Sequence, residues 1–315
     1  MPSSGTSSTG GAVSVRAPAK INLTLDVLGL RPDGCHEVAT VYQTLTLADR
    51  LDVRLSWVPD DGPTIVVSAD DPEVPAGPAN LVYRAVEAVL RRAGSLNGAV
   101  ASGLSPRVEV AIAKAIPVAA GLGGGSSDAA AALTAVNGLL GGRVAPAALA
   151  GLAAALGSDV PFFLRGGTAL ARGRGEDVEP LADAPPFHVV LVKAGRKEST
   201  AGVYARHDRM APGGGGRRDR SRAAALAIRG GDPTALAASI GNDLAAAARE
   251  LAPEIARVES ALVATGAEAV AVSGAGPTVF ALYRGAEQAA SAERLMASLF
   301  PWTALAEFAS PAGDR

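Results

Sequence analysis

A glycine-rich segment constrains this chain more than any other feature of its sequence. Gly121–Ser127 reads Gly-Leu-Gly-Gly-Gly-Ser-Ser and lies between a run typical of a strand and an Ala-rich run typical of a helix. Glycine lets backbone N–H groups turn toward an anion, and the following helix start adds unpaired N–H groups and its positive dipole end. The serines add hydroxyl donors, whose oxygen is also of the type that magnesium accepts as a ligand. The segment therefore predicts a loop for a di- or triphosphate, with a flexible linker as the alternative.

Two familiar phosphate-binding motifs do not fit this segment. A Rossmann fingerprint would require a third glycine at the position of Ser126. A Walker loop ends in Gly-Lys-Ser/Thr, and the segment contains no lysine. If the segment binds a phosphate, it therefore belongs to neither of these two classes, and the flexible linker stays the alternative.

Hydrophobic periodicity predicts strands and helices in no regular alternation, which indicates an α+β class. Strands are expected over Val13–Arg16 and Ile21–Leu28, separated by a bend at Ala17–Lys20. Asn80 is expected to cap a helix that runs from Leu81 to about Ala93. Further strands are expected over Val38–Leu47, Leu51–Trp57, Thr64–Ser68, Arg107–Ala113, Phe187–Lys193, Ala269–Ser273, Thr278–Leu282 and Thr303–Phe308. Further helices are expected from about Asp128 to Leu140 and over Pro146–Leu156, Ala223–Ile228, Pro233–Ile240, Asp243–Leu251, Pro253–Thr265 and Ala286–Leu299.

Length and composition limit the function classes. A chain of 315 residues exceeds one compact core, so two domains are expected. The net charge of −2 argues against a nucleic-acid-binding face. One cysteine excludes an intramolecular disulfide, and three scattered histidines argue against a structural metal site.

Neither the N-terminal segment nor the most apolar stretch predicts a secretory signal or a membrane span. The segment before residue 12 lacks a basic stretch followed by an apolar run, so it is interpreted as a disordered tail rather than a secretory signal. The most apolar stretch, Val144–Leu156, is shorter than a membrane span and contains a proline and a glycine. A cytoplasmic protein without a membrane partner is expected. The arginines at 217, 218, 220 and 222 are interpreted as a solvated surface insertion rather than an anion site.

The glycine-rich segment resembles the phosphate loop of the GHMP kinases, which include galactokinase, homoserine kinase and mevalonate kinase. The resemblance covers Pro117–Ala130, and Ser273–Thr278 resembles the second glycine motif of that family. It implies a two-domain fold: an N-terminal domain like the second domain of ribosomal protein S5 and a ferredoxin-like C-terminal domain, with the active site between them. The implied ranges are 12–170 for the ATP-binding domain, 171–310 for the C-terminal domain and 1–11 for the tail.

Four further segments resemble one branch of this family, whose members act in the non-mevalonate isoprenoid pathway. They are Pro18–Leu23, Arg31–Glu37, Gly157–Phe163 and Gly241–Leu244, and they occur in matching order along the chain. The resemblance implies that ATP, with Mg²⁺, phosphorylates the 2-hydroxyl of 4-diphosphocytidyl-2-C-methyl-D-erythritol. The products would be the 2-phosphate and ADP, and the partner is this small cytidyl diphosphate.

The resemblance also implies roles for individual residues. Lys20 and Asp159 would be catalytic: Asp159 as the base that accepts the hydroxyl proton, and Lys20 as the group that orients the hydroxyl and stabilises negative charge. Asn22, His36 and Tyr204 would bind the substrate, with His36 at the cytosine edge and Tyr204 stacked on the ring. The ATP-binding residues would be Pro117, Val118, Ala119, Ala120, Gly121, Leu122, Gly123, Gly124, Gly125, Ser126, Ser127, Asn80 and Lys114. No metal-ligating residue is assigned.

Without the resemblance, each of these residues has an ordinary interpretation. Asp159 would be a turn former, Lys20 a surface residue, Asn80 a helix cap and Tyr204 a packing residue. One position departs from the family pattern, because Cys35 occupies the place of a tyrosine that forms one face of the cytosine site. Two alternatives remain open: a GHMP kinase for a smaller alcohol, such as homoserine or mevalonate, and a catalytically inactive relative that binds ligand.

Overall fold

The computed structural model describes residues 10–59, 62–94, 104–195, 199–211 and 219–311. Contacts group these residues into two compact units that alternate along the chain. Unit 1 contains the chain up to Ala17, Asp49–Ala115 and Gly125–Leu164, and unit 2 contains Pro18–Ala48, Ile116–Gly124 and the chain from Arg165. The domain ranges 12–170 and 171–310 stay a prediction. Of the expected tail, residues 1–9 lie outside the described residues.

Two long strands, β1 (Gly11–Leu30) and β2 (His36–Val58), contribute residues to both units. The expected bend at Ala17–Lys20 was wrong, because β1 continues through Pro18. A proline removes one ladder donor, and the neighbouring strand β8 (Gly241–Asn242) pairs with β1 only at Thr24 and Leu25. The two strands expected before and after residue 48 are likewise one strand, β2.

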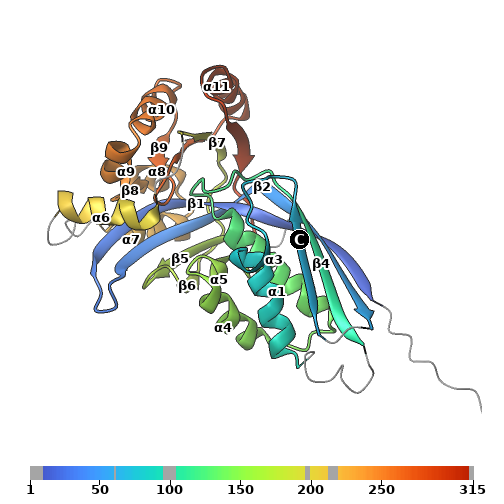
Figure 1. Cartoon of the computed structure of the whole chain (residues 1–315). Coiled ribbons are helices and arrows are strands. Elements are labelled where there is room, and N and C mark those ends of the chain that lie inside the picture. The colour runs from blue at the N-terminus through green and yellow to red at the C-terminus, as the bar shows by residue number, and fades with distance from the viewer. Residues whose placement is uncertain (1–9, 60–61, 95–103, 196–198, 212–218, 312–315) are drawn as a thin grey trace, which may run out of the picture. The chain divides into compact units, whose positions relative to one another are not determined.

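Unit 1 is a sheet covered by helices on one face (Figure 1). β3 (Thr64–Ala69) pairs parallel with β4 (Ser105–Ala113), and β4 pairs antiparallel with β2. The helices of this unit are α1 (Leu81–Arg92), α3 (Gly124–Leu139), α4 (Pro146–Leu156) and the short α5 (Val160–Phe163), and a single 3-10 turn, η1 (Gly77–Ala79), precedes α1.

The helices of unit 1 follow from their sequence patterns. In α1, Val82, Val86 and Val89 recur at helical spacing and are fully buried. The Asn80 side chain accepts a hydrogen bond from Val82 N at 2.8 Å, which confirms the predicted cap. In α3, alanines are buried on several sides, which lets this helix pack closely against its neighbours.

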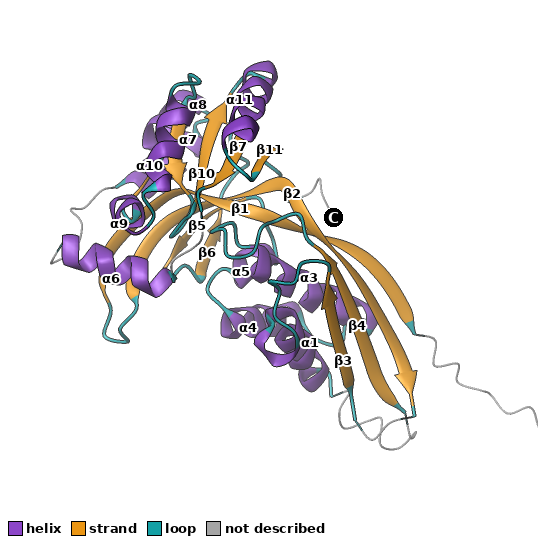
Figure 2. Cartoon of the chain, turned by 45° about the horizontal axis from the view of Figure 1, so that its top comes forward, coloured by secondary structure: helices purple, strands orange, loops and turns teal. Residues whose placement is uncertain are grey.

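Unit 2 contains a four-stranded antiparallel sheet (Figure 2). Its strand order is β11 (Thr303–Glu307), β7 (His188–Lys193), β10 (Thr278–Tyr283), β9 (Ala269–Val272). Alternate residues of β7 enter different cores: Val189 and Leu191 belong to one, Val190 and Val192 to the other. Helices α10 (Glu254–Val263) and α11 (Ala286–Leu299) pack on one face, whereas α7 (Arg220–Arg229) and α8 (Pro233–Ser239) contribute to the core on the other.

The remaining elements of unit 2 surround the Pro18–Ala48 portion of β1 and β2. β5 (Thr168–Arg172) pairs antiparallel with β2 and with β6 (Asp177–Pro180). Helices α6 (Thr200–Met210) and α9 (Ala245–Leu251) complete the unit. The sequence patterns did not predict β5, β6, β8, α5 or α6, because these elements are short or carry no clear apolar period.

Candidate active site

The phosphate-loop segment, Pro117–Ser127, meets the second glycine motif backbone to backbone. Gly121 has a φ of +80° and Gly123 a φ of +73°, a region that glycine adopts without steric cost. A Cβ on Gly121 would lie 2.7 Å from the carbonyl oxygen of Ser273 and 2.8 Å from that of Gly276. Because both neighbours are backbone atoms, this position requires glycine.

Hydrogen bonds join the two motifs. The Ser273 hydroxyl donates to Gly121 O at 3.0 Å, and Thr278 N donates to Ala120 O at 3.3 Å. Ala119, with a φ of +53°, also lies in the left-handed region. Left-handed residues in a turn bring backbone N–H groups together into a concave anion site. The positive φ values at Ala119, Gly121 and Gly123 suit such a turn, and the phosphate contact of this loop stays a prediction.

The first turn of α3 belongs to this loop, because the helix begins at Gly124 rather than near Asp128. The N–H groups of a first helical turn have no partner within the helix. A Cβ on Gly125 would meet no atom within 4 Å. Ser127 Oγ and Asp128 Oδ1 are buried and find no hydrogen-bond partner among the described residues. The helix start thus offers N–H donors and two unsatisfied oxygen atoms.

Lys114, just after β4, lies between two buried carboxylates. Its Nζ forms an ion pair with Asp49 and another, at 2.9 Å, with Asp128; the three side chains are 7%, 0% and 5% exposed. Burial raises the pKa of Asp128 to about 7, the Asp49 carboxylate adds to the rise, and the Lys114 ammonium opposes it. Burial alone would lower the pKa of Lys114, but the two carboxylates raise it above its usual value. The ATP-binding role expected for Lys114 stays a prediction.

The Asn80 side chain forms hydrogen bonds with the backbone of unit 1. Besides capping α1, its Nδ2 donates to Pro75 O at 2.8 Å. Its ATP-binding role stays a prediction, while its ordinary role as a helix cap is present in the structure.

Lys20 and Asn22 lie on the same face of β1, as their spacing in a strand requires. Lys20 Nζ donates to Asn22 Oδ1 at 2.6 Å and lies 4.9 Å from the centroid of the Tyr42 ring. Asn22 Nδ2 donates to Thr40 Oγ1 at 2.8 Å. Lys20 is only 4% exposed, so it is not the surface residue that its sequence context alone suggests.

The backbone of β1 is tied to both glycine motifs at this point. Lys20 N donates to Leu122 O at 2.9 Å, and Asn22 N donates to Ser273 Oγ at 3.4 Å. A Cβ on Gly274 would lie 3.3 Å from Asn22 Oδ1. Unit 2 therefore brings the predicted catalytic lysine beside the phosphate loop.

Asp159 lies in unit 1 on the turn between α4 and α5. It directly precedes α5 and is partly exposed, but its side chain forms no capping hydrogen bond with this helix. The turn position agrees with the sequence-based expectation. Its role as base stays a prediction.

His36 and Tyr204 are brought together in unit 2. Their rings stack with centroids 4.6 Å apart and an interplanar angle of 26°. His36 Nε2 and Asp208 Oδ1 are 2.8 Å apart. The predicted substrate-binding pair is therefore a preformed stack, and a base could contact its edge or an outer face but not lie between the two rings. The adjacent Cys35 is partly exposed.

Sequence reasoning missed Asp208 and Thr40, which hold His36 and Asn22. Asp208 follows Tyr204 by four residues, so both lie on one face of α6. That spacing would have been informative had a helix been expected there. Thr40 lies 18 residues from Asn22 in sequence and is found only through strand pairing.

The interpretation of the arginine cluster as solvated surface was wrong for Arg220. Residues 217 and 218 lie outside the described residues, and Arg222 is 76% exposed. Arg220 is instead 21% exposed and pairs with Asp243 at 2.6 Å and Asp26 at 3.5 Å. Two buried carboxylates far away in sequence attract this one arginine, which composition could not reveal.

Comparison with known proteins assigns the family. The profile of the GHMP kinases N terminal domain matches residues 80–167, and that of the GHMP kinases C terminal domain matches residues 223–301. The chain belongs to the GHMP kinase family. This confirms the family expected from the two glycine motifs.

Curated relatives place this GHMP kinase in the expected branch. A 4-diphosphocytidyl-2-C-methyl-D-erythritol kinase of Pelotomaculum thermopropionicum is 47% identical over 81% of this chain and 83% of its own length. The protein of the same name from Nocardia farcinica is 44% identical over 82% of this chain and 80% of its own.

Solved structures confirm the predicted two-domain GHMP kinase fold. A crystal structure of 4-(cytidine 5'-diphospho)-2C-methyl-D-erythritol kinase matches with a TM-score of 0.73 and 34% identity, covering 95% of this chain and all of the other. A mevalonate kinase of L. major, in complex with R-mevalonate, matches with a TM-score of 0.71 at 16% identity over 97% of this chain and 98% of its own, which shows the shared fold alone. Among the described residues, no helix has the length and apolar character needed to cross a bilayer.

Proposed function

We propose that this GHMP kinase transfers the γ-phosphoryl group of ATP to the 2-hydroxyl of 4-diphosphocytidyl-2-C-methyl-D-erythritol in the non-mevalonate isoprenoid pathway, in the cytoplasm. The observation that carries the proposal is the buried Lys20, held by Asn22 and tied through its backbone to the phosphate loop. Relatives named for this activity, at 44–47% identity, support the substrate.

Phosphoryl transfer depends mainly on positioning and on stabilisation of charge. The loop N–H groups and the first turn of α3 would hold the triphosphate, and Lys20 would stabilise charge on the hydroxyl that attacks. Asp159 would accept the hydroxyl proton. A positioned general base of this kind contributes about 10²–10⁴ in rate.

The residues at the start of α3 fit a Mg²⁺ ion that accompanies ATP. Mg²⁺ prefers hard oxygen ligands and keeps part of its water shell. Ser127 Oγ and Asp128 Oδ1 are such atoms, and both are buried without a hydrogen-bond partner in the described chain. When bound, the ion would neutralise charge on the phosphate oxygens, and these two residues would hold it.

The His36–Tyr204 stack would bind the cytosine. Asp208 accepts a hydrogen bond from Nε2–H of His36, which leaves Nδ1 as the ring nitrogen for the edge of the cytosine. Tyr204 offers an aromatic face for the ring. With Cys35 in place of the family's tyrosine, this side of the pocket has one aromatic ring fewer.

One experiment distinguishes the proposed function from the two alternatives, a GHMP kinase for a smaller alcohol and an inactive ligand-binding relative. ADP release would be measured with the cytidyl substrate, with mevalonate and with homoserine at equal concentrations. We expect turnover with the cytidyl substrate alone. Turnover with one of the smaller alcohols would instead assign another GHMP kinase activity. No turnover with any, although ATP binds, would support an inactive ligand-binding relative.

A further inference from the structure

One face of β1 carries a row of buried polar side chains. The opposite face is apolar throughout, from Ile21 to Val27, as expected for a strand buried on both sides. The polar row consists of Lys20, Asn22, Thr24 and Asp26, which are 4%, 3%, 0% and 2% exposed. Burying polar groups costs free energy unless each is hydrogen-bonded. A row of four therefore needs partners.

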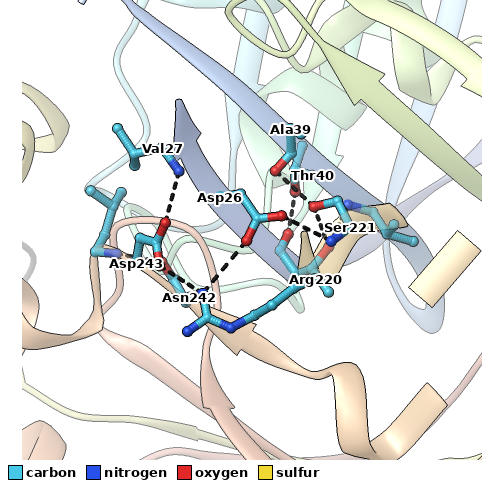
Figure 3. A network of polar contacts seen from close by, with 11 residues as sticks. Asp26, Val27, Ala39, Thr40, Arg220, Ser221, Asn242 and Asp243 are labelled. Atoms are coloured by element: carbon cyan, nitrogen blue, oxygen red, sulfur yellow. Dashed lines mark hydrogen bonds and ion pairs between the residues drawn. The ribbon is translucent and has the colours of Figure 1, made fainter. Parts of the chain in front are cut away.

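Ser221, at the start of α7, supplies the central partner (Figure 3). Val41 N donates to Thr24 Oγ1 at 3.1 Å, and the Ser221 hydroxyl donates to Ala39 O at 2.9 Å. The two hydroxyl oxygens of Thr24 and Ser221 are 2.8 Å apart. Since the Ser221 proton goes to Ala39, Thr24 donates to Ser221. The hydroxyl pair of Thr24 and Ser221 is therefore bonded to the β2 backbone at Ala39 and Val41, the residues on either side of Thr40.

Thr40 connects this hydroxyl pair to the substrate-facing residues. Its hydroxyl donates to Thr24 O at 2.6 Å and accepts from Asn22 Nδ2 at 2.8 Å. Asn22 in turn accepts from Lys20 Nζ. Ser221 is thus linked to the Lys20 ammonium in two steps that meet at Thr24: the Thr24 hydroxyl bonds to Ser221, and the Thr24 backbone carbonyl accepts the hydrogen bond that leads through Thr40 and Asn22 to Lys20.

The other end of the row is held by charge (Figure 3). Asp26 accepts from Ser221 N at 2.9 Å and pairs with Arg220. Asp243 pairs with Arg220 and accepts from Val27 N at 3.0 Å. Burial raises the pKa of Asp26, whereas Ser221 and Arg220 lower it. Arg220 therefore fixes the start of α7 against β1.

The residue before Asp243 extends the network to the second glycine motif. Asn242 Nδ2 donates to Val272 O at 2.8 Å and to Gly274 O at 2.7 Å. Gly274 is the residue whose added Cβ would approach Asn22. Asp243 thus holds β1, and its neighbour Asn242 holds the second glycine motif.

We propose that Thr24 and Ser221 are positioning residues that hold Lys20 and Asn22 in the geometry required for phosphoryl transfer. The inference rests on the proposed function, since that function gives Lys20 its role. Thr24 and Ser221 are 0% and 2% exposed, so we assign neither hydroxyl a contact with substrate. They act through Thr40 and Asn22, and a displacement of about 1 Å at a reacting group can cost about 10² in rate.

A matched pair of substitutions tests the proposal. Thr24→Val keeps the volume of the side chain but removes its hydroxyl, whereas Thr24→Ser keeps the hydroxyl and removes a methyl group. We expect kcat to fall by about ten- to a hundredfold in Thr24→Val, with an unchanged KM for ATP. Thr24→Ser should keep kcat near that of the parent, even though both changes lower the melting temperature. Equal kcat in the two variants would overturn the proposal.

A second measurement does not depend on activity. The labelling rate of the Lys20 amine by an acylating reagent, followed by mass spectrometry, should rise in Thr24→Val and stay at the parent rate in Thr24→Ser. Ser221→Ala breaks the same hydroxyl pair from the side of α7, so it should behave like Thr24→Val. It takes the place of Thr24→Val if Thr24→Val does not fold. Unchanged labelling in both hydroxyl-deficient variants would overturn the positioning role. A parent protein without turnover would contradict the proposed function instead, and the labelling would still decide the positioning.

Discussion

The two units each contain a cation between two buried carboxylates, but they satisfy these charges in different ways. In unit 1, Lys114 faces Asp49 and Asp128, all nearly buried; Asp49 accepts a backbone N–H from Ala115 at 2.7 Å, but Asp128 Oδ1 has no hydrogen-bond partner in the described chain. In unit 2, Arg220 is partly exposed, and the carboxylates of Asp26 and Asp243 also accept backbone N–H groups. The unit 1 cluster therefore depends more on its single cation.

The two clusters also lie beside different regions that we propose for ligands. The Lys114 cluster adjoins the helix start that would hold ATP, whereas the Arg220 cluster adjoins the strand that would hold the alcohol substrate. Substitutions in the first region should therefore change folding and ATP binding. Substitutions in the second should change turnover or substrate affinity more than ATP binding.

The largest expected effect is on stability. Lys114→Met leaves two buried carboxylates without their cation, and removal of one partner of a buried ion pair costs about 3–5 kcal/mol. Arg220→Met should cost about 1–2 kcal/mol, because both carboxylates keep backbone donors. Urea denaturation of the ligand-free proteins measures both values.

Arg249→Met is the control for this comparison. Arg249 pairs with a single carboxylate, that of Glu259 at 2.6 Å, and it lies on α9 outside both clusters. It should cost less than either of the other changes, since exposed pairs contribute about 0–1 kcal/mol. A loss of stability in Arg220→Met equal to that in Lys114→Met would contradict the difference between the clusters.

The next effect is a pH dependence that belongs to unit 1. The pKa of Asp128 is raised from 3.8 to about 7, so between these values the folded protein keeps a proton that the unfolded chain has lost. The free energy of unfolding should therefore fall as pH rises through this range, by up to about 1.4 kcal/mol per pH unit. Asp128→Asn should remove this part of the slope.

Denaturation midpoints of parent and Asp128→Asn, measured from pH 4 to 8, check the sign. Arg220→Met serves as the comparison, because Asp128 remains in it and the slope should persist. Parallel curves for parent and Asp128→Asn would show that Asp128 is already charged in the folded protein at low pH.

The smallest effect concerns the cytosine side of unit 2. Cys35→Tyr restores an aromatic ring beside the His36–Tyr204 stack, and stacking of a base on an aromatic ring contributes about 1–3 kcal/mol. Because the added ring would be partly exposed, we expect the KM for the cytidyl substrate to fall by up to about tenfold, or about 1.4 kcal/mol. The KM for ATP should not change. A weaker cytidyl affinity would place the base elsewhere, and Cys35→Ser controls for loss of the thiol.

Much of this fold could be predicted from sequence because its signals are local. The Asn80 cap, the apolar period of α1 and the alternation in β4 each depend on neighbouring residues, and the structure has them all. The extent of β1 could not be predicted, because tolerance of Pro18 depends on where a distant strand pairs. The helix start at Gly124 was missed because glycine weakens a helix interior but is tolerated in a first turn.

The site could be predicted only where motifs carry it. The two glycine motifs and Lys20 are found from sequence, and unit 2 brings them together. The partners that hold them could not be found this way. Ser221 lies 197 residues from Thr24, and no local pattern links the two.

The most direct test of the central claim follows the transferred phosphoryl group. ³¹P NMR of parent protein with ATP, Mg²⁺ and 4-diphosphocytidyl-2-C-methyl-D-erythritol should show a new phosphomonoester signal that grows in proportion to ADP. Asp159→Asn should slow its growth by about 10²–10⁴ while ATP affinity stays near that of the parent. Release of inorganic phosphate without the phosphomonoester, or an unchanged rate in Asp159→Asn, would contradict the proposed reaction or the proposed base, respectively.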